Sequence, residues 1–326
     1  MIYLFVDSSG FGGIESHIQQ LAMLLQSQQT GVEVVFLQQY PSHPQYAQLK
    51  LQRIPFRFLS DSSVIGFFRH LKPGDVVHAH GYKASILARI SSLFASFHLV
   101  TTFHAGESVS GKLAYYEWLN RYTACLSYNL AVSEKIRKAQ PFRCELLRNF
   151  VRCKKELIRR DRHATLQVGF VGRLSHEKAI DRFVSLSRQL PDSECHVFGD
   201  GEQAHLLDGV ALTWHGAVPS MTPYWQQLDV LLIPSRAEGM PMAALEAMAH
   251  GVVVLSTDVG EMPSLLDEGC LTAESNWSFL SQKVIELDIA GDERWLQLSR
   301  RQQQRVRDDF SGEACWQQLA QIYRLA

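Results

Sequence analysis

The feature that most constrains the fold is an alternation of short apolar runs with amphipathic segments. Residues 2–6 predict a buried strand, and a glycine-rich turn follows at residues 8–13. Residues 14–25 carry apolar side chains at helical spacing, and residues 32–37 predict the next strand. A strand, a turn, a helix and a second strand in this order predict the start of a parallel α/β sheet.

The same alternation continues, stops at a polar segment and then restarts. In the first series the further predicted elements are strands at 75–80, 98–103, 126–132 and 146–147, and helices at 82–93 and after the N-cap residue Ser133. In the second series they are strands at 167–171, 194–198, 212–215, 230–233 and 252–256, helices at 180–190 and 242–250, and a mostly helical end from about 276. Between the two series, residues 152–163 (RCKKELIRRDRH) are basic and polar, which is typical of a domain boundary or of a solvated helix face.

Two series of this kind predict an α/β protein with two doubly wound, Rossmann-like parallel sheets. The length of 326 residues also suggests about two domains. We expect an N-terminal domain at 1–155, a C-terminal domain at 156–305 and an amphipathic final segment at 306–326. In doubly wound sheets ligands bind at the carboxyl ends of the strands, so two facing domains predict a cleft between them.

The composition excludes several classes of protein. No run of about 18 uncharged apolar residues predicts a membrane span, and no basic segment at the start suggests a secretory signal. The six cysteines show neither C-x-x-C nor zinc spacing, so we expect reduced thiols in a cytoplasmic protein. Metal-ligand spacing, a D-x-D motif and a Walker A loop are absent from the sequence, and basic residues do not alternate with aromatic ones, so neither a metal nor nucleic acid is expected.

The charges are distributed unevenly along the chain. Residues 1–165 carry 20 Lys and Arg against 11 Asp and Glu, a net charge of +9, while residues 166–326 carry 12 against 22, a net charge of −10. A basic half suggests an anionic surface or acceptor as its partner. The alternative is simple attraction between the two halves.

The strongest motif is the segment 235–251, SRAEGMPMAALEAMAHG, which follows a predicted strand. Glu238 precedes a helix that Pro241 starts, and Glu246 lies within that helix. Two carboxylates therefore lie near one helix N-terminus, with the backbone N–H groups around Gly239 and Met240 between them, an arrangement that suits a polyhydroxyl or anionic ligand. The plainer interpretation is a helix-terminal acid and a surface acid.

A second motif, GFVGRLSHEK at 169–178, follows the first strand of the second series. Arg173 comes directly after the strand and Gly172, and Lys178 precedes the next helix. A forked guanidinium and a compact ammonium can stabilise the charge of a departing diphosphate. The alternative is that both are ordinary surface cations.

These two motifs resemble the E-x7-E and G-R-L-x-x-E-K motifs of retaining glycosyltransferases of the GT-B fold, in particular glycosyltransferase family 4. The resemblance implies that Glu238 and the adjacent backbone (Gly239, Met240, Pro241) hold the donor sugar, that Glu246 binds the nucleotide ribose, and that Arg173, Lys178 and Gly172 hold the diphosphate. It also implies that Val218, in the segment HGAVP, contacts the base through its backbone, and that the final helix crosses back to the N-terminal domain. The segment 147–152 (LRNFVR) departs from the P-N-G-V-D pattern of the family and keeps only Asn149 of its polar residues.

The opening turn GFGGIE at 10–15 allows two interpretations. Its glycines can expose backbone N–H groups to a phosphate, and the resemblance implies that Gly12 and Gly13 face the donor diphosphate, with Glu15 on the acceptor side. The rival is a dinucleotide-binding turn, for which Glu33 would be the ribose-binding acid. Glu15 stands where that pattern needs its third glycine.

Two histidines complete the predicted site. His104, in TTFHAG, follows a strand, and the resemblance implies that it contacts the donor sugar at the reaction centre; a loop histidine of structural role is the alternative. His80, in DVVHAHG, is expected on the acceptor side or, equally, packed in the interior.

The sequence thus predicts a metal-independent, retaining glycosyltransferase without a cofactor, whose donor is a nucleotide diphosphate sugar. We expect it to act in cell-surface polysaccharide, lipopolysaccharide or glycolipid synthesis on a carbohydrate or lipid-linked acceptor. Arg53, Arg57, Arg69 and Lys72, around the apolar segments 56–59 and 64–68, suggest peripheral contact with an anionic membrane. Two other functions stay open: a nucleotide-sugar epimerase of the same fold, and a non-catalytic nucleotide-sugar-binding subunit.

Overall fold

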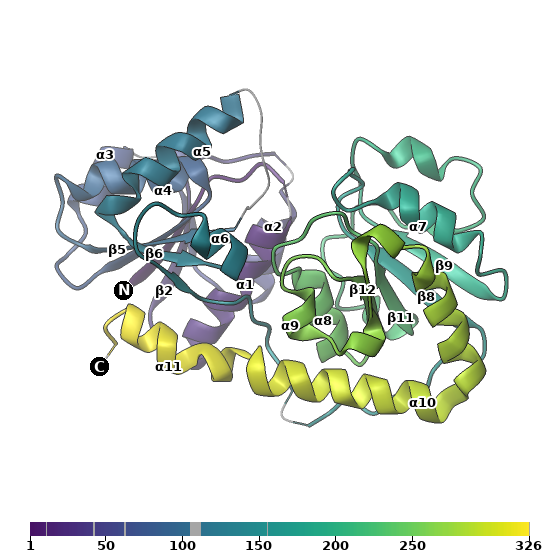
Figure 1. The fold of residues 1–326 in the computed structure, drawn as a ribbon. Helices are drawn as coiled ribbons and strands as arrows, with labels where there is room; N and C mark the ends of the chain where they lie inside the picture. Colours follow the sequence, from purple (N-terminus) through teal and green to yellow (C-terminus); the bar gives the residue numbers. More distant parts are fainter. Residues whose placement is uncertain (11, 42, 62, 105–111, 155, 326) are drawn as a thin grey trace. The chain divides into compact units, whose positions relative to one another are not determined.

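The computed structural model describes residues 1–325 apart from residues 11, 42, 62, 105–111 and 155. The chain forms two compact units. Unit 1 comprises Met1–Asn149 together with Gly312–Ala326, and unit 2 comprises Phe150–Ser311. Unit 1 is therefore discontinuous, since its last segment follows all of unit 2 in the sequence (Figure 1).

Unit 1 is built on a seven-stranded sheet whose described strands are all parallel and run in the order β3-β2-β1-β4-β5-β6-β7. The strands are β1 (Ile2–Val6), β2 (Val32–Phe36), β3 (Phe56–Phe58), β4 (Val76–His80), β5 (His98–Phe103), β6 (Tyr128–Ala131) and β7 (Cys144–Leu146). The central strands are buried on both faces, which is the usual pattern of a parallel sheet between helices, although β4 and β5 carry buried histidines and threonines among their apolar residues.

The helices of unit 1 cover both faces of this sheet (Figure 1). One group packs together as α3, α4 and α5, and α1 packs against α11. The helices are α1 (Gly13–Ser27), α2 (Pro44–Leu51), α3 (Val64–Arg69), α4 (Tyr82–Ser92), α5 (Lys112–Tyr122), α6 (Glu134–Lys138) and α11 (Gly312–Ile322). Helix α6 begins as predicted, because the Ser133 side chain accepts a hydrogen bond from the Ile136 N–H.

Unit 2 repeats the architecture with six described parallel strands in the order β10-β9-β8-β11-β12-β13. The strands are β8 (Leu166–Val171), β9 (Ser193–Phe198), β10 (Thr213–Trp214), β11 (Val230–Ile233), β12 (Val253–Thr257) and β13 (Leu271–Thr272). The helices are α7 (Ile180–Ser187), α8 (Met242–Ala249), α9 (Met262–Leu265) and α10 (Phe279–Asp309), the last of which is interrupted at Gly291. Helix α10 packs along α8 and β12 and closes one large apolar core.

Both sheets have the strand order 3-2-1-4-5-6 of the doubly wound fold, and unit 1 adds a seventh strand. The predicted fold class is confirmed. In such a sheet the order in which strands are added reverses between two neighbouring parallel strands, and ligands bind beyond the carboxyl ends of those strands. These switch points lie between β1 and β4 in unit 1 and between β8 and β11 in unit 2.

Two details differ from the sequence-based expectations. The segment 56–58 forms the edge strand β3 rather than a surface patch, and Phe68 is buried in the core. Pro241 precedes the first residue of α8 as its N-cap instead of occupying the first turn. No helix within the described residues is long and apolar enough to cross a membrane.

Candidate functional site

The two strongest motifs meet at the carboxyl ends of β8 and β11. The Nζ atom of Lys178 lies 2.6 Å from Oε2 of Glu238, although 60 residues separate the two. The Glu238 side chain is only 4% exposed, whereas that of Lys178 is 30% exposed. The ammonium group is therefore held by a buried carboxylate while part of it faces solvent.

Further hydrogen bonds fix the Glu238 carboxylate in one position. The hydroxyl of Ser235 donates to Glu238 Oε1 at 2.8 Å, and the Ser235 carbonyl in turn accepts a hydrogen bond from the Thr257 hydroxyl at 2.7 Å. Both oxygens of Glu238 thus accept a hydrogen bond. Ser235 and Thr257 are buried, so this support comes from the ends of β11 and β12.

A second ion pair joins the two motif loops. Arg236 donates from Nη1 and Nη2 to the two oxygens of Asp181 at 2.8 and 2.6 Å, and its backbone N–H donates to the Glu177 carbonyl at 2.8 Å. The hydrogen bond from Arg236 is the main reason why the pKa of Asp181 lies below its usual value. A forked pair of this kind fixes both distance and orientation, so it ties the loop after β11 to the start of α7, while the backbone hydrogen bond ties it to the loop after β8.

Arg173 differs from these paired cations. It follows Gly172 at the end of β8 and is exposed. Among the residues that the structure describes, none forms a hydrogen bond or an ion pair with its guanidinium. Its charge adds to hydrogen bonds from the Glu177 N–H and Ser175 in lowering the pKa of the nearby Glu177 carboxyl. The guanidinium itself stays exposed beside Lys178 and can therefore bind an anionic ligand at little desolvation cost.

The remaining residues of the E-x7-E segment lie where the motif predicts. Gly239 and Met240 connect Glu238 to α8, and Glu246 lies more than one turn inside that helix. Gly260, at φ +59°, packs directly against this loop: a Cβ atom there would come within 2.3 Å of the Glu238 carbonyl. Only glycine fits at this position, and its neighbour Glu261 donates its N–H to the Gly239 carbonyl at 2.9 Å.

Glycines also support the loop that carries Arg173. A Cβ atom at Gly199 would come within 1.9 Å of the Gly172 carbonyl, so the turn after β9 can approach only without a side chain. This gives the G-D-G turn at 199–201 a structural role. Val218 lies in the loop after β10, where it packs half-buried against the core of unit 2.

In unit 1, Gly12 and Gly13 lie exposed at the N-terminus of α1, beyond the end of β1. A Cβ atom at Gly13 would meet no described atom within 4 Å, so packing within the protein does not require this glycine. Glu15 is buried, and its Oε2 accepts a hydrogen bond from the Gly12 N–H at 2.7 Å, which caps the helix. Phe11 of the same motif lies outside the described residues.

The two predicted histidines of unit 1 contact each other. Nδ1 of His80, the last residue of β4, lies 3.0 Å from Nε2 of His104, which follows β5. Burial is the main cause that lowers the pKa of both rings well below the usual value, and neighbouring histidines add to the effect. Ala105 and Gly106 of the TTFHAG segment lie outside the described residues.

Sequence reasoning missed several residues that complete these arrangements. Ser235, Arg236 and Asp181 fix the loops of unit 2, and none had been assigned a role. His17 lies on the buried face of α1 next to His80 and His104. The available signal was its position among the apolar residues of that helix, where a histidine is unexpected.

Comparisons with known proteins cover both units. A family model described as Glycosyltransferase Family 4 matches residues 11–140, and one described as Glycosyl transferases group 1 matches residues 165–288. A putative teichuronic acid biosynthesis glycosyltransferase, TuaC of Bacillus subtilis, is 38% identical over 99 residues, which cover 29% of this chain and 25% of the relative. The lipopolysaccharide core biosynthesis mannosyltransferase LpsB of Rhizobium meliloti is 33% identical over 119 residues, 31% of this chain and 34% of the relative. The matched segments thus span a quarter to a third of these relatives.

A solved structure is similar over the whole chain. The structure of Alr3699/HepE of Anabaena in complex with UDP-glucose superposes with a TM-score of 0.80 at 16% identity, covering 100% of this chain and 99% of the other. At this identity the likeness concerns the fold, which is that of two-domain GT-B proteins.

Proposed function

The chain belongs to glycosyltransferase family 4, and from this premise we propose that it transfers a sugar from a nucleotide diphosphate sugar to an acceptor hydroxyl with retention of configuration. The observation that carries the proposal is the meeting of Lys178 and Glu238 beside the exposed Arg173, at the switch point of the unit 2 sheet. Family membership alone indicates the class of reaction, which is glycosyl transfer. The arrangement of Lys178, Glu238 and Arg173 adds the charged groups that the departure of a diphosphate requires.

The chemistry requires that a diphosphate leaves with its negative charge stabilised. Arg173 supplies a guanidinium that no described residue pairs, and Lys178 supplies an ammonium whose present partner is Glu238. When the diphosphate binds, Lys178 shares its protons between the phosphate oxygens and Glu238. Donors placed in advance of the reaction stabilise the charge that develops in the transition state.

The carboxylates have different tasks in this proposal. Glu238, held by Ser235 and Lys178, presents a fixed acceptor to the hydroxyl groups of the donor sugar. Glu246 binds the ribose, and the backbone at Gly239, Met240 and Pro241 lies at the positive N-terminal end of α8. Gly172 and Val218 complete the donor contacts.

We assign the remaining contacts to unit 1. His104 contacts the donor sugar, Gly12 and Gly13 leave their backbone open to the diphosphate, and Glu15 and His80 belong to the acceptor side. Because Glu15 caps α1 and His80 binds His104, both act by holding their neighbours in position. The reaction needs no cofactor besides the donor, and no metal has a role in it.

Binding of the donor is tested with purified protein and UDP, GDP, ADP and their common sugar conjugates. UDP and UDP-glucose come first, because the similar Anabaena protein was solved with UDP-glucose. At 100 times its dissociation constant a ligand should add about 2.7 kcal/mol to the free energy of unfolding. Arg173→Ala should abolish most of this stabilisation, whereas Arg188→Ala, an exposed cation at the end of α7, should leave it intact. Equal stabilisation of both variants would refute the role of Arg173.

Turnover separates the proposal from its alternatives. Transfer to an acceptor with the donor's anomeric configuration, followed by NMR, supports a retaining transferase. Isomerised donor in the absence of any acceptor would identify an epimerase. Tight donor binding without any product, across a panel of carbohydrate and lipid-linked acceptors, would favour a non-catalytic subunit.

The surface of unit 1 is suited to contact with an anionic membrane that carries a lipid-linked acceptor. The sequence suggests the segments 56–59 and 64–68 for this contact, whereas the structure favours helix α5. Arg57 pairs with Glu33 at 2.6 Å and Phe68 is buried, so of the large apolar side chains described in segments 56–59 and 64–68 Ile65 alone is exposed, next to the exposed cations Arg69 and Lys72. Helix α5 instead exposes a row of aromatic side chains at helical spacing, with Tyr115, Trp118 and Tyr122 each more than half exposed. Aromatic rings of this kind favour the membrane interface.

Sedimentation with vesicles that contain anionic phospholipid tests this surface. Replacement of Trp118 and Tyr122 by Ser should weaken binding about tenfold, since each ring would lose its apolar contact with lipid. Phe279→Ser is the matched control, because this exposed ring lies at the start of α10 in unit 2. Binding that is unaffected by the α5 changes would place the membrane contact elsewhere.

A further inference from the structure

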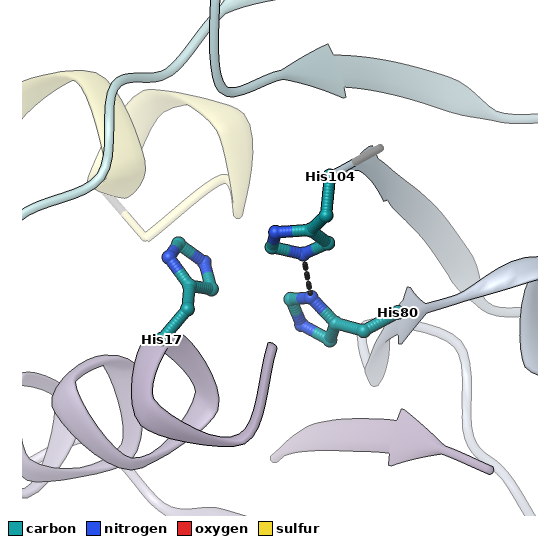
Figure 2. Close-up of side chains that lie close together, drawn as sticks. All are labelled: His17, His80 and His104. Carbon is teal, nitrogen blue, oxygen red and sulfur yellow. Dashed lines mark hydrogen bonds between the residues drawn. The ribbon is translucent and has the colours of Figure 1, made fainter. Parts of the chain in front are cut away.

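Three histidines from separate elements of unit 1 converge at the carboxyl ends of its central strands. His17 lies on α1, His80 ends β4 and His104 follows β5 (Figure 2). Each ring offers one nitrogen, and these three nitrogens all lie within 4.8 Å of one another. The His17 ring is centred 5.5 Å from that of His80 and 4.9 Å from that of His104. We call these three residues the histidine cluster.

The cluster consists of neutral ligands. Burial lowers the pKa of His17 to about 4, although a hydrogen bond from its ring to the Asn149 side chain acts in the opposite direction. The same cause, burial, lowers the pKa of His80 and His104 well below the usual value. A neutral imidazole carries a proton on one nitrogen and a free lone pair on the other, and that second nitrogen is the one that binds a metal ion.

Hydrogen bonding within unit 1 leaves part of the cluster unsatisfied. His78, whose ring is centred 4.2 Å from that of His80 at a tilt of 38°, has both nitrogens engaged, one with the Tyr323 hydroxyl at 2.6 Å and one with the Thr102 hydroxyl at 2.7 Å. Nε2 of His80 is buried and has no hydrogen-bond partner among the described residues. An unsatisfied buried nitrogen costs stability, so a ligand that engages this ring is favoured.

We propose that His17, His80 and His104 together bind one transition-metal dication of the zinc class through their imidazole nitrogens. Three imidazoles are a known ligand set for Zn²⁺, with the fourth position open to water. Tetrahedral Zn–N bonds of about 2.0–2.1 Å place ligand nitrogens about 3.3 Å apart, so rotation of the rings has to close a gap of at most 4.8 Å. His104 is half-buried, which gives the ion an approach from its side.

The ligand set also selects the ion. Imidazole suits Zn²⁺, Cu²⁺, Ni²⁺ and Co²⁺, whereas Mg²⁺ and Ca²⁺ require oxygen ligands, and the cluster offers none of its own. Metal-binding histidines usually have their second nitrogen held by another group. The hydrogen bond between Asn149 and His17 supplies such support on the α1 side.

Metal binding at the histidine cluster should also change the activity of the protein, an expectation that rests on the proposed function. A metal ion on His104 removes this ring from the donor sugar, so Zn²⁺ should inhibit transfer. The binding proposal itself needs no donor, no acceptor and no turnover.

The test is a titration of the chelator-treated full-length chain with Zn²⁺, in competition with a chromophoric chelator. We expect one ion per chain, no competition by Mg²⁺ and, with Co²⁺ in place of Zn²⁺, the visible absorption bands of a four-coordinate site. His17→Gln should weaken Zn²⁺ binding at least tenfold. His215→Gln is the matched control in unit 2, where Nε2 of His215 lies 3.1 Å from Nδ1 of His196 and these two form no group of three close ligand atoms with another described residue. It should leave the binding unchanged.

Unchanged Zn²⁺ binding in His17→Gln would overturn the proposal, as would a wild-type chain that binds no ion. Should His17→Gln fail to fold by circular dichroism, His104→Gln replaces it, because this half-buried position tolerates the change more easily. The two proposals fail separately. Zn²⁺ that binds without inhibiting an active enzyme refutes the consequence for His104, whereas a chain that binds Zn²⁺ but transfers no sugar counts against the proposed function alone.

Discussion

The two units use the same strand order but place different chemistry at the ends of their sheets. Beyond β8 and β11 of unit 2, charged side chains are paired: Lys178 with Glu238, and Arg236 with Asp181. Beyond β4 and β5 of unit 1, the corresponding places hold the neutral rings of His80 and His104. The topology therefore decides where ligands can bind, while the residues at the strand ends decide which ligands those are.

Buried charged residues away from the strand ends show the same contrast between neutral partners in unit 1 and charged partners in unit 2. The buried Arg89 of unit 1 donates to neutral oxygens of Asn120, Thr101, Ser127 and Asn129, at distances from 2.6 to 3.3 Å. In unit 2 the buried Asp229 accepts from Arg160 at 3.2 Å and from His163 at 3.0 Å. Unit 1 is not without ion pairs, since Lys83 binds Asp7 at 3.1 Å beyond β1.

The largest effect is expected at the ion pair of unit 2. Glu238→Gln keeps the shape of the side chain but removes the charge that holds Lys178, and it weakens the contact proposed for the donor sugar. We expect kcat/KM to fall by about 10²–10³-fold, the range for loss of one placed polar group. Glu286→Gln, an exposed acid on α10, should retain full activity. A fall of less than tenfold for Glu238→Gln would mean that unit 2 binds the donor without this carboxylate.

The next effect concerns the neutral network of unit 1. Arg89→Met keeps an apolar stem but removes the guanidinium donor from both oxygens of Asn120 and from the Thr101 hydroxyl, whereas Asn129 Oδ1 keeps the hydroxyls of Thr101 and Ser127 as donors. We expect a loss of about 3 kcal/mol in the free energy of unfolding, since each orphaned buried group costs about 1–3 kcal/mol. Urea unfolding measures it. An unchanged midpoint would show that neutral partners leave this cation without net value to the fold.

A smaller effect is expected at the pair that joins the loops of unit 2. Arg236→Met should raise KM for the donor about tenfold by loosening the Arg173 loop, with kcat changed less. The pair also has a pH dependence. Because Arg236 lowers the pKa of Asp181, its stabilisation is present above about pH 4, the unfolded value, and is lost as the pH falls through the folded value. Thermal unfolding between pH 7 and pH 3 should therefore show a steeper loss for the wild type than for Asp181→Asn, and parallel curves would contradict this.

The smallest effect is expected at a surface pair of unit 1. Arg57 and Glu33 form a bidentate pair at 2.6 Å, but the Arg57 side chain is half exposed. Arg57→Gln should change the free energy of unfolding by less than about 1 kcal/mol. It should also leave vesicle binding unchanged, because this cation is already paired. A clear loss of vesicle binding would restore the segment 56–59 as the membrane contact.

Much of the fold could be predicted from the sequence, because the strands are short apolar runs. Strands β1, β5 and β11 begin and end at the predicted residues. Strands β3 and β13 are not predicted, because they have only three and two residues. The sequence Phe-Arg-Phe of β3 instead suggests an exposed basic and apolar patch. Helix α5 was not predicted either, since aromatic side chains on a solvent face give no helical apolar stripe.

The site could be predicted only where its residues are close in sequence. Glu238 and Arg173 each belong to a continuous sequence motif, and such a motif predicts the local conformation of the loop that contains it. The contact between Lys178 and Glu238 requires that β8 and β11 pair in the sheet. The pairing of strands cannot be read from a single sequence. The histidine cluster is harder still, because its three members come from a helix and two strands and share no spacing.

The discontinuity of unit 1 has a consequence for how the chain is made. Residues 312–326 leave the ribosome after the whole of unit 2, yet α11 packs on α1, and Tyr323, directly after α11, supplies the hydroxyl that binds His78. Unit 2 can therefore fold while unit 1 still lacks one of its helices. Until residues 312–326 emerge, the Tyr323 hydroxyl is not available to bind His78. The sheet of unit 1, which is synthesised first, therefore still lacks α11 and this hydrogen bond while unit 2 is being made.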